Sequence, residues 1–297
     1  MFAAKCLVGI NICTSILGIL GNLLVCIAVF STKGVTSSFH YFISSLAAAD
    51  LVNSLVVQPL LIALIFAHLK PESIPYDPDD ICTAFRVVSN FACAVSLLTL
   101  ALIALDRCFI VSPHFDYRHT MTAKKKIVLA VVWLLACVYS AMRLTIEKTI
   151  TSYLTAAAFG LCYVEMIACY AIVYHQISKQ RKLLAATCAQ NKTRSERTEV
   201  QELKAENIAK ERRFTRTIVM VLIVFTGGWS IFFYLRLMQP EKDYGIRYNV
   251  ARTLAFSTSA INPALYCFNN KEYRHAFKRI LSSLLFARRR EGYQRIM

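Results

Sequence analysis

Four polar side chains stand inside long apolar runs of this sequence. Asn22, Asp50, Ser96 and Asn262 are each flanked by hydrophobic residues. An Asn or a Ser in such a run can be satisfied by local hydrogen bonds. An Asp is harder to accommodate, because at the centre of a membrane it costs about 2.5–3.5 kcal/mol on insertion scales. Asp50 therefore requires a partner, a cation or a proton.

A pair of opposite charges ends another apolar run. The stretch "LIALDRCFIV" (102–111) carries Asp106 and Arg107 directly after its hydrophobic part. Two full charges at this point predict the end of a helix that has crossed a membrane.

The elements that hold these residues follow from the composition. The chain has 297 residues, of which 56% are hydrophobic and only 18% are charged. A membrane β-barrel is excluded, because its strands would alternate apolar and polar residues over about ten positions. The prediction is an all-α membrane protein with a bundle of seven transmembrane helices in one domain. The predicted helices lie near 7–31, 40–67, 81–111, 125–146, 149–175, 207–238 and 247–268.

The basic residues predict the orientation of the chain. With the N-terminus outside, 25 of the 34 Lys and Arg residues fall on the cytoplasmic side, and eleven of these lie between Lys179 and Arg216. The net charge of +16 is thus explained by topology, and nucleic-acid binding has no motif to support it. We expect a multi-pass plasma-membrane protein with an extracellular N-terminus and a cytoplasmic C-terminus.

The cysteines and histidines indicate no enzyme. The eleven Cys are scattered singly, the six His form no cluster, and no Ser or Cys lies in a nucleophile motif. Cys82 lies at the outer end of the third segment, but the following outer loop has no Cys to bridge to it. We therefore predict neither catalysis, nor a metal cluster, nor an outer disulfide.

Each predicted helix carries one marker, and the order of the markers is informative. The sequence resembles the rhodopsin-like, or class A, G-protein-coupled receptors in this respect. By this resemblance a short amphipathic eighth helix is expected at 270–286. The markers are Asn22 in "GNLLV", Asp50 in "SLAAAD", Asp106 and Arg107 in "LDRC", Trp133, Tyr170, Phe225 and Trp229 in "FTGGW", and Asn262, Pro263 and Tyr266 in "NPALY".

The resemblance also implies roles for these residues. Asp50, Ser96 and Asn262 correspond to an allosteric sodium site, which is the one non-protein component expected. Arg107 corresponds to the arginine that acidic groups restrain at rest, and Tyr170 and Tyr266 to tyrosines that move inward on activation.

The acidic partner of this arginine is expected on the sixth helix. Glu211 precedes Trp229 by 18 residues, which is five helical turns, so the two share a face. A lock between Arg107 and Glu211 is therefore predicted.

Several positions depart from the family pattern. Cys108 replaces the usual Tyr, Gly228 and Ile231 replace the Cys and Pro around Trp229, and Cys162 replaces the fifth-helix proline. The sixth helix thus loses its expected kink, although Gly227 and Gly228 can soften it. These departures place the coupling strength and the swing of this helix in question.

Because it lacks the outer disulfide and the fifth-helix proline, the chain loosely resembles the group of melanocortin, cannabinoid, lysophospholipid and adenosine receptors. No ligand follows from this, because Leu60, Cys82 and Arg86 replace the melanocortin acids. The adenosine-binding Asn and His are likewise replaced, by Arg236 and Phe256.

The outer half of the bundle indicates the class of ligand. Ser89 replaces the Asp of amine receptors, and Phe256 replaces the lysine that binds retinal. By their positions in the family pattern, Arg86, Arg236 and Arg252 are expected near the ligand cavity. Guanidinium groups bind carboxylate or phosphate bidentately. Alternatively, they reach toward the interface or pair with Asp79, Asp80 or Glu147. The predicted ligand-binding residues are Arg86, Ser89, Asn90, Arg236 and Arg252.

Three functions remain open at this stage. The first is a receptor that binds an extracellular ligand, such as a small anionic molecule, and activates heterotrimeric G proteins. A peptide, lipid or amine ligand is the alternative within this function. The second is a non-signalling or biased receptor, and the third is a seven-helix ion transporter, for which Asp50 and Glu165 provide too few polar groups. Arrestin, a receptor kinase and anionic lipid, through "FARRR" (286–290), are further expected partners.

Overall fold

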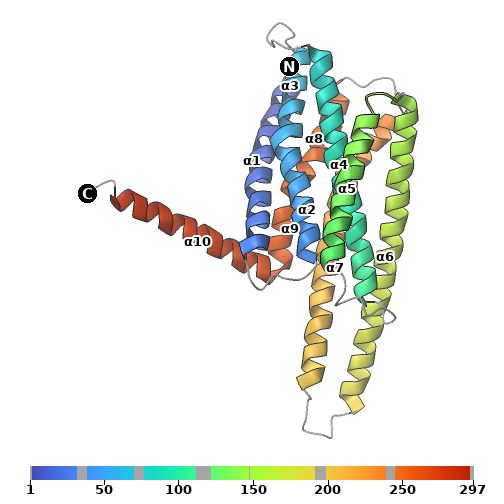
Figure 1. The fold of residues 1–297 in the computed structure, drawn as a ribbon, viewed down its shortest axis with the longest axis vertical. Coiled ribbons are helices and arrows are strands. Elements are labelled where there is room, and N and C mark those ends of the chain that lie inside the picture. Colours follow the sequence, from blue (N-terminus) through green and yellow to red (C-terminus); the bar gives the residue numbers. More distant parts are fainter. Residues whose placement is uncertain are drawn as a thin grey trace.

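The fold is a bundle of long helices. The computed structural model describes residues 2–31, 39–69, 77–111, 122–146, 148–190, 199–238 and 245–294, and all the elements within these ranges are helical. Figure 1 shows the helices running side by side, with α10 leaving the bundle sideways at one end. The prediction of an all-α membrane protein with seven transmembrane helices is confirmed.

Seven spans account for eleven of the described helical segments. Five spans are single helices: α1 (Phe2–Ser31), α4 (Pro78–Val111), α5 (Thr122–Met142), α6 (Lys148–Gln190) and α7 (Glu199–Met238). The second consists of α2 (Phe39–Val52), η1 (Asn53–Val57) and α3 (Gln58–Leu69). The seventh consists of α8 (Ile246–Ser257), η4 (Thr258–Ala260) and α9 (Asn262–Asn269), and α10 (Lys271–Gln294) follows it.

Prolines explain why two spans are interrupted. Pro59 has no N–H for the carbonyl one turn earlier, and the turn before it widens into a π-helix in which Gln58 N–H donates to Asn53 O. In the seventh span Pro263 lies at the start of α9, directly after a 3₁₀ turn. The two interruptions face the same interior region, where Asn53 Nδ2 donates to Ser259 Oγ at 2.8 Å.

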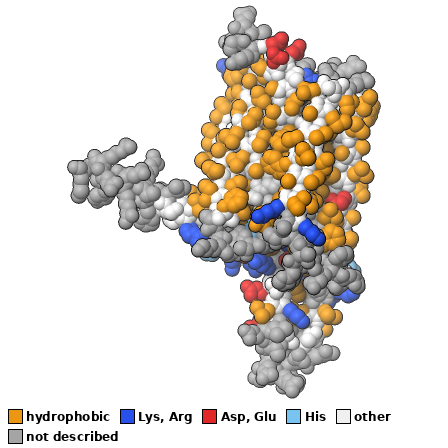
Figure 2. Space-filling view, viewed as in Figure 1, with side chains coloured by type: hydrophobic (Ala, Val, Ile, Leu, Met, Phe, Trp, Pro, Cys, Tyr) orange, Lys and Arg blue, Asp and Glu red, His pale blue; other side chains and the backbone are white. Residues whose placement is uncertain are grey.

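The apolar surface matches a membrane environment. Among the described residues, six helices are long and apolar enough to cross a bilayer. The pieces of the seventh span are individually shorter than a crossing requires. Figure 2 shows hydrophobic side chains covering the sides of the bundle, while many of the visible Lys and Arg gather toward the end from which α10 departs.

Some helix ends differ from the predicted ranges. The fourth helix ends at Met142, before the predicted 146, because Leu144 and Thr145 donate their N–H groups to Ala141 and Met142 in turns. The fifth helix continues to Gln190, and the sixth begins at Glu199, through residues with high helix propensity. Figure 1 shows α6 and α7 extending together beyond the rest of the bundle. For the tail segment 286–290 the structure describes the backbone alone.

The α7 helix is continuous through Gly227 and Gly228, and only the second glycine is crowded. A Cβ atom on Gly228 would lie 2.4 Å from Thr258 Cγ2 and 3.2 Å from Leu254 O, whereas one on Gly227 would meet nothing within 4 Å. Thr258 cannot turn away freely, because its Oγ1 donates to Ala255 O at 2.7 Å. Gly228 therefore permits the close approach of α7 and α8.

Gly228→Ala is expected to destabilise the bundle by about 1–3 kcal/mol through overpacking. Gly227→Ala is the matched control and should be neutral or stabilising, because an open helical Gly costs up to about 1 kcal/mol relative to Ala. Thermal unfolding of the two purified variants gives the melting temperatures to be compared. Equal melting temperatures would show that α8 yields to the added methyl group.

Candidate functional site

A cluster of four charged side chains joins α4, α5 and α7 at the end of the bundle near α10. Arg107 Nη1 donates to Glu211 Oε2 at 3.0 Å, and Arg107 is only 2% exposed. Arg107 also donates to Asp106 Oδ2. The other carboxylate oxygen of Asp106 accepts from Lys125 Nζ at 2.5 Å. Two acids and two bases thus alternate, and they hold Arg107 between its neighbour and the sixth span.

The helix that carries Glu211 is also held by α10. Lys210 Nζ lies 3.1 Å from Glu272 Oε1, so neighbouring residues of α7 pair with two different elements. On the other side of α10, the Tyr273 hydroxyl lies 2.9 Å from His40 Nδ1 of α2. Burial raises the pKa of Tyr273, so its phenol remains neutral. Opening α7 away from Arg107 would therefore also break its contact with α10.

Tyr170 and Tyr266 lie in the interior with their hydroxyl groups unsatisfied. Both side chains are buried, and neither hydroxyl has a hydrogen-bond partner among the described residues. A buried hydroxyl without a partner costs free energy, which a rearrangement can recover. The two tyrosines therefore have donors available for a state of the bundle other than this one.

A second polar site surrounds Asp50 in the middle of the bundle. Asn262 Nδ2 donates to Asp50 Oδ2 at 2.8 Å, and Asp50 is 3% exposed. Asn22 Nδ2 donates to Ser259 O at 3.2 Å, and Asn53 donates to the hydroxyl of the same serine. The side-chain carbonyl oxygens of Asn22 and Asn53 are buried without donors. One carboxylate and several unsatisfied oxygens are ligands that suit a small hard cation.

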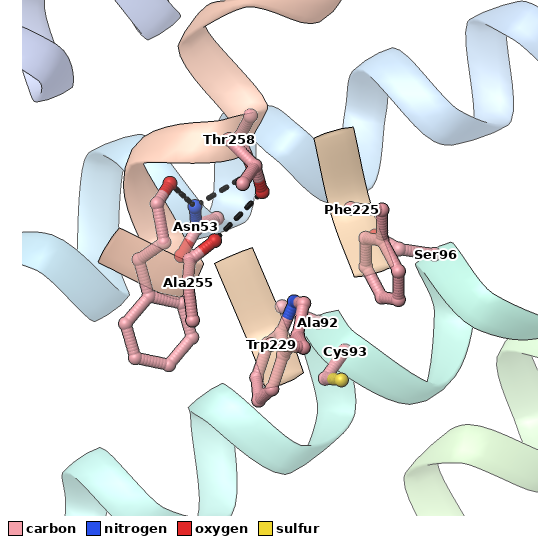
Figure 3. A pocket seen from close by; sticks show the side chains of 10 residues that line it. Asn53, Ala92, Cys93, Ser96, Phe225, Trp229, Ala255 and Thr258 are labelled. Carbon is pink, nitrogen blue, oxygen red and sulfur yellow. Dashed lines mark hydrogen bonds between the residues drawn. The ribbon is translucent and has the colours of Figure 1, made fainter. Parts of the chain in front are cut away.

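A small cavity of about 20 Å³ adjoins this polar site. It is lined by Ser96 and Cys93 of α4, by Trp229 of α7, and by Asn53 and Ser259 (Figure 3). Trp229 belongs to an aromatic cluster that also lines the cavity, and its ring centroid lies 5.5 Å from that of Phe256 and 5.8 Å from that of Phe225. A shift of α7 at Trp229 would thus change the shape of the cavity next to Asp50.

The predicted ligand residues lie further toward the outer end and do not line this cavity. Arg252 is buried, with its guanidinium 5.2 Å from the centroid of Phe85 and 5.9 Å from that of Tyr248. Arg86 donates weakly from Nε to Cys82 O, at 3.4 Å, and Arg236 is half-buried in the last turn of α7. Ser89 Oγ donates to Arg86 O.

The contacts of two basic residues were not predicted from the sequence. Lys125 is one of three consecutive lysines, yet it is 4% exposed while Lys124 and Lys126 are exposed. Its burial could have been found from helical spacing, because it shares a face with the buried Val132 and Ala136. Arg143 was likewise overlooked.

This geometry defines a multi-pass helical membrane protein in which a network of charged side chains locks the end of the bundle near α10. The family described as "7 transmembrane receptor (rhodopsin family)" matches residues 21–152 and 143–266. The chain belongs to this family, and it is a G-protein-coupled receptor of the rhodopsin type.

The curated relatives are distant but cover most of the chain. A probable G-protein coupled receptor No18 of Amphibalanus amphitrite is 24% identical, over 89% of this chain and 86% of the relative. Adenosine receptor A2b of Bos taurus is 23% identical, over 95% and 91% respectively. The 5-hydroxytryptamine receptor 1D of Oryctolagus cuniculus is 24% identical, over 89% and 85%. These relatives are receptors, which is a class of protein without enzymatic activity.

Proposed function

We propose that this receptor binds a small anionic ligand from the extracellular side and activates heterotrimeric G proteins on the cytoplasmic side. The observation that carries the signalling part is the pairing of Arg107 with Glu211 at 3.0 Å across α4 and α7. A ligand that favours an arrangement with this pair open would shift the population of the bundle toward it. In that arrangement Arg107 is released toward the G protein.

The orientation and the cation belong to the same proposal. The excess of Lys and Arg toward the α10 end supports a plasma-membrane protein with an extracellular N-terminus. A sodium ion, if bound, would be held by Asp50 with Asn262 and the hydroxyl of Ser96, and it would supply a counter-charge that favours the resting bundle. Arrestin, a receptor kinase and anionic lipid would engage the same cytoplasmic end.

The anionic ligand is supported by Arg252. This guanidinium is buried in the outer part of the bundle, 5.2 Å from the ring centroid of Phe85 and 5.9 Å from that of Tyr248. A cation in such a setting attracts carboxylate or phosphate. A peptide, lipid or amine ligand is the competing proposal, and it requires no such charge.

Screening carboxylates, nucleotides, lipids, amines and short peptides for G-protein activation in cells tests the ligand class. For an anionic agonist from this screen, Arg252→Ala should weaken potency by at least about tenfold, the scale of one lost charge-assisted contact. The control is Arg247→Ala, which removes an exposed charge from the same helix. Unchanged potency in Arg252→Ala at equal surface expression would remove Arg252 from the ligand site.

The other two functions make different predictions in the same cells. A non-signalling receptor would bind the agonist without dissociating any G protein. An ion transporter would produce current when the purified chain is reconstituted in a planar bilayer.

A further inference from the structure

A fourth arginine lies at the outer end of the bundle, on a different side of α4 from Arg252. Arg143 follows α5 directly, and its Nη1 lies 3.3 Å from Asn90 Oδ1 on α4. The same nitrogen lies 3.2 Å from Thr155 Oγ1 on α6 and 3.3 Å from the Tyr139 hydroxyl. Arg143 therefore bridges three helices through a single nitrogen.

These contacts leave most of the guanidinium available. Nη1 carries two hydrogens and shares them among three neutral oxygens, while Nε and Nη2 have no partner among the described residues. Thr155 already donates to Thr151 O, which leaves its hydroxyl oxygen to accept. The Nε and Nη2 edge is the part of arginine that binds carboxylate and phosphate bidentately.

Helix capping does not explain this arginine. A cation after a helix C-terminus often bonds to the last carbonyl groups. All the recorded bonds of Arg143 go instead to side chains, and two of the three belong to other helices. The contacts hold the guanidinium at the seam of α4, α5 and α6 through Nη1, and they do not use its Nε and Nη2 edge.

A second guanidinium lies on the same face of α4. Arg86 precedes Asn90 by four residues, so it lies one turn further outward on the side that Arg143 contacts. Its only recorded bond runs from Nε to its own helix, which leaves its terminal nitrogens without a partner among the described residues. Phe85, which packs under Arg252, points to a different side of α4.

We propose that Arg143 and Arg86 form a phosphate-binding subsite at the outer end of the seam between α4, α5 and α6, with Asn90 and Thr155 orienting Arg143. Two guanidinium groups that have no carboxylate partner among the described residues suit a group that carries two negative charges, as a phosphate monoester does. The phosphate belongs either to a soluble organic phosphate or to an outer-leaflet phospholipid. This inference rests on the proposed anionic ligand and names its chemistry and its anchor.

The test measures thermal unfolding of the purified full chain in two kinds of nanodisc. One arm uses phosphatidylcholine alone and titrates phenyl phosphate, with uncharged dimethyl phenyl phosphate as the control probe. The other arm uses one part phosphatidic acid to four parts phosphatidylcholine, without a soluble probe. Binding to the folded state raises the melting temperature.

We expect Arg143→Gln to raise the phenyl phosphate concentration for half-maximal stabilisation by at least about tenfold. Arg86→Gln should also weaken binding. Arg143→Lys should retain only part of the wild-type binding, because lysine keeps the charge but loses the planar guanidinium that binds phosphate bidentately. Arg247→Gln is the control for a lost outer charge. Melting without probe identifies any variant that fails to fold.

An Arg143-dependent stabilisation in the first arm identifies a soluble phosphate, and one confined to the second arm identifies a lipid. The subsite would be overturned if phenyl phosphate in the first arm and phosphatidic acid in the second stabilised Arg143→Gln as much as wild type. The proposed function fails separately, if Arg143-dependent binding occurs but no anion activates a G protein. Conversely, an anionic agonist that needs Arg252 but not Arg143 would retain the function and remove the subsite.

Discussion

Replacing Glu211 with Ala is expected to raise ligand-independent G-protein activation about tenfold. Glu211 links Arg107 to α7, and the bond is charged at both ends. A hydrogen bond to a charged group contributes about 1.5–3 kcal/mol, and 1.4 kcal/mol corresponds to a tenfold change in an equilibrium constant. The variant therefore moves the resting equilibrium toward a bundle in which α7 is free to swing.

G-protein dissociation in cells, at matched surface expression and without ligand, measures this effect. Glu206→Ala is the control, because Glu206 is an exposed carboxylate on the same helix. An unchanged or lower baseline in Glu211→Ala would contradict the lock.

Lys125→Met is expected to change the baseline in the opposite direction, by about fivefold. Asp106 divides its two oxygens between Arg107 and Lys125, so the lysine competes with the arginine for the same carboxylate. Removing Lys125 leaves one cation for two acids, which holds Arg107 more firmly. The free-energy change from losing a charged competitor is of the same order as that from losing a hydrogen bond to a charged group.

A low wild-type baseline would hide a decrease, so Lys125→Met is best measured in the Glu211→Ala background. The double variant should activate G proteins about fivefold less than Glu211→Ala alone, a scale set by one charged contact. Lys124→Met is the control, since Lys124 is an exposed neighbour in the same turn. A higher baseline in the double variant would mean that Lys125 stabilises the resting state.

The sequence predicted the spans and the pairing of distant polar residues well. Apolar length alone located the seven spans, because the bilayer sets how many apolar residues a crossing needs. The five-turn spacing puts Glu211 on the same face of its helix as Trp229, and in the structure Glu211 contacts Arg107. Asp50 required a partner on energetic grounds, and the structure places Asn262 against it.

Side-chain partners that depend on how helices are rotated were harder to predict. Lys125 is one of three consecutive lysines, and its pairing with Asp106 depends on how α5 packs against α2 and α4. Arg143 follows the helix end, where the chain leaves its periodic pattern, so spacing could not show that it reaches Asn90. The interruption at Asn53–Val57 lies in an apolar run whose only signal is Pro59.

Nucleotide exchange on purified G proteins tests most directly whether Glu211 restrains a coupling arginine. This restraint predicts that purified Glu211→Ala receptor, without ligand, accelerates exchange above the receptor-free rate on at least one class of heterotrimer. It further predicts that adding Arg107→Gln returns exchange to the receptor-free rate. Exchange that persists in this double variant, or the absence of acceleration by Glu211→Ala on every class of heterotrimer, would contradict it.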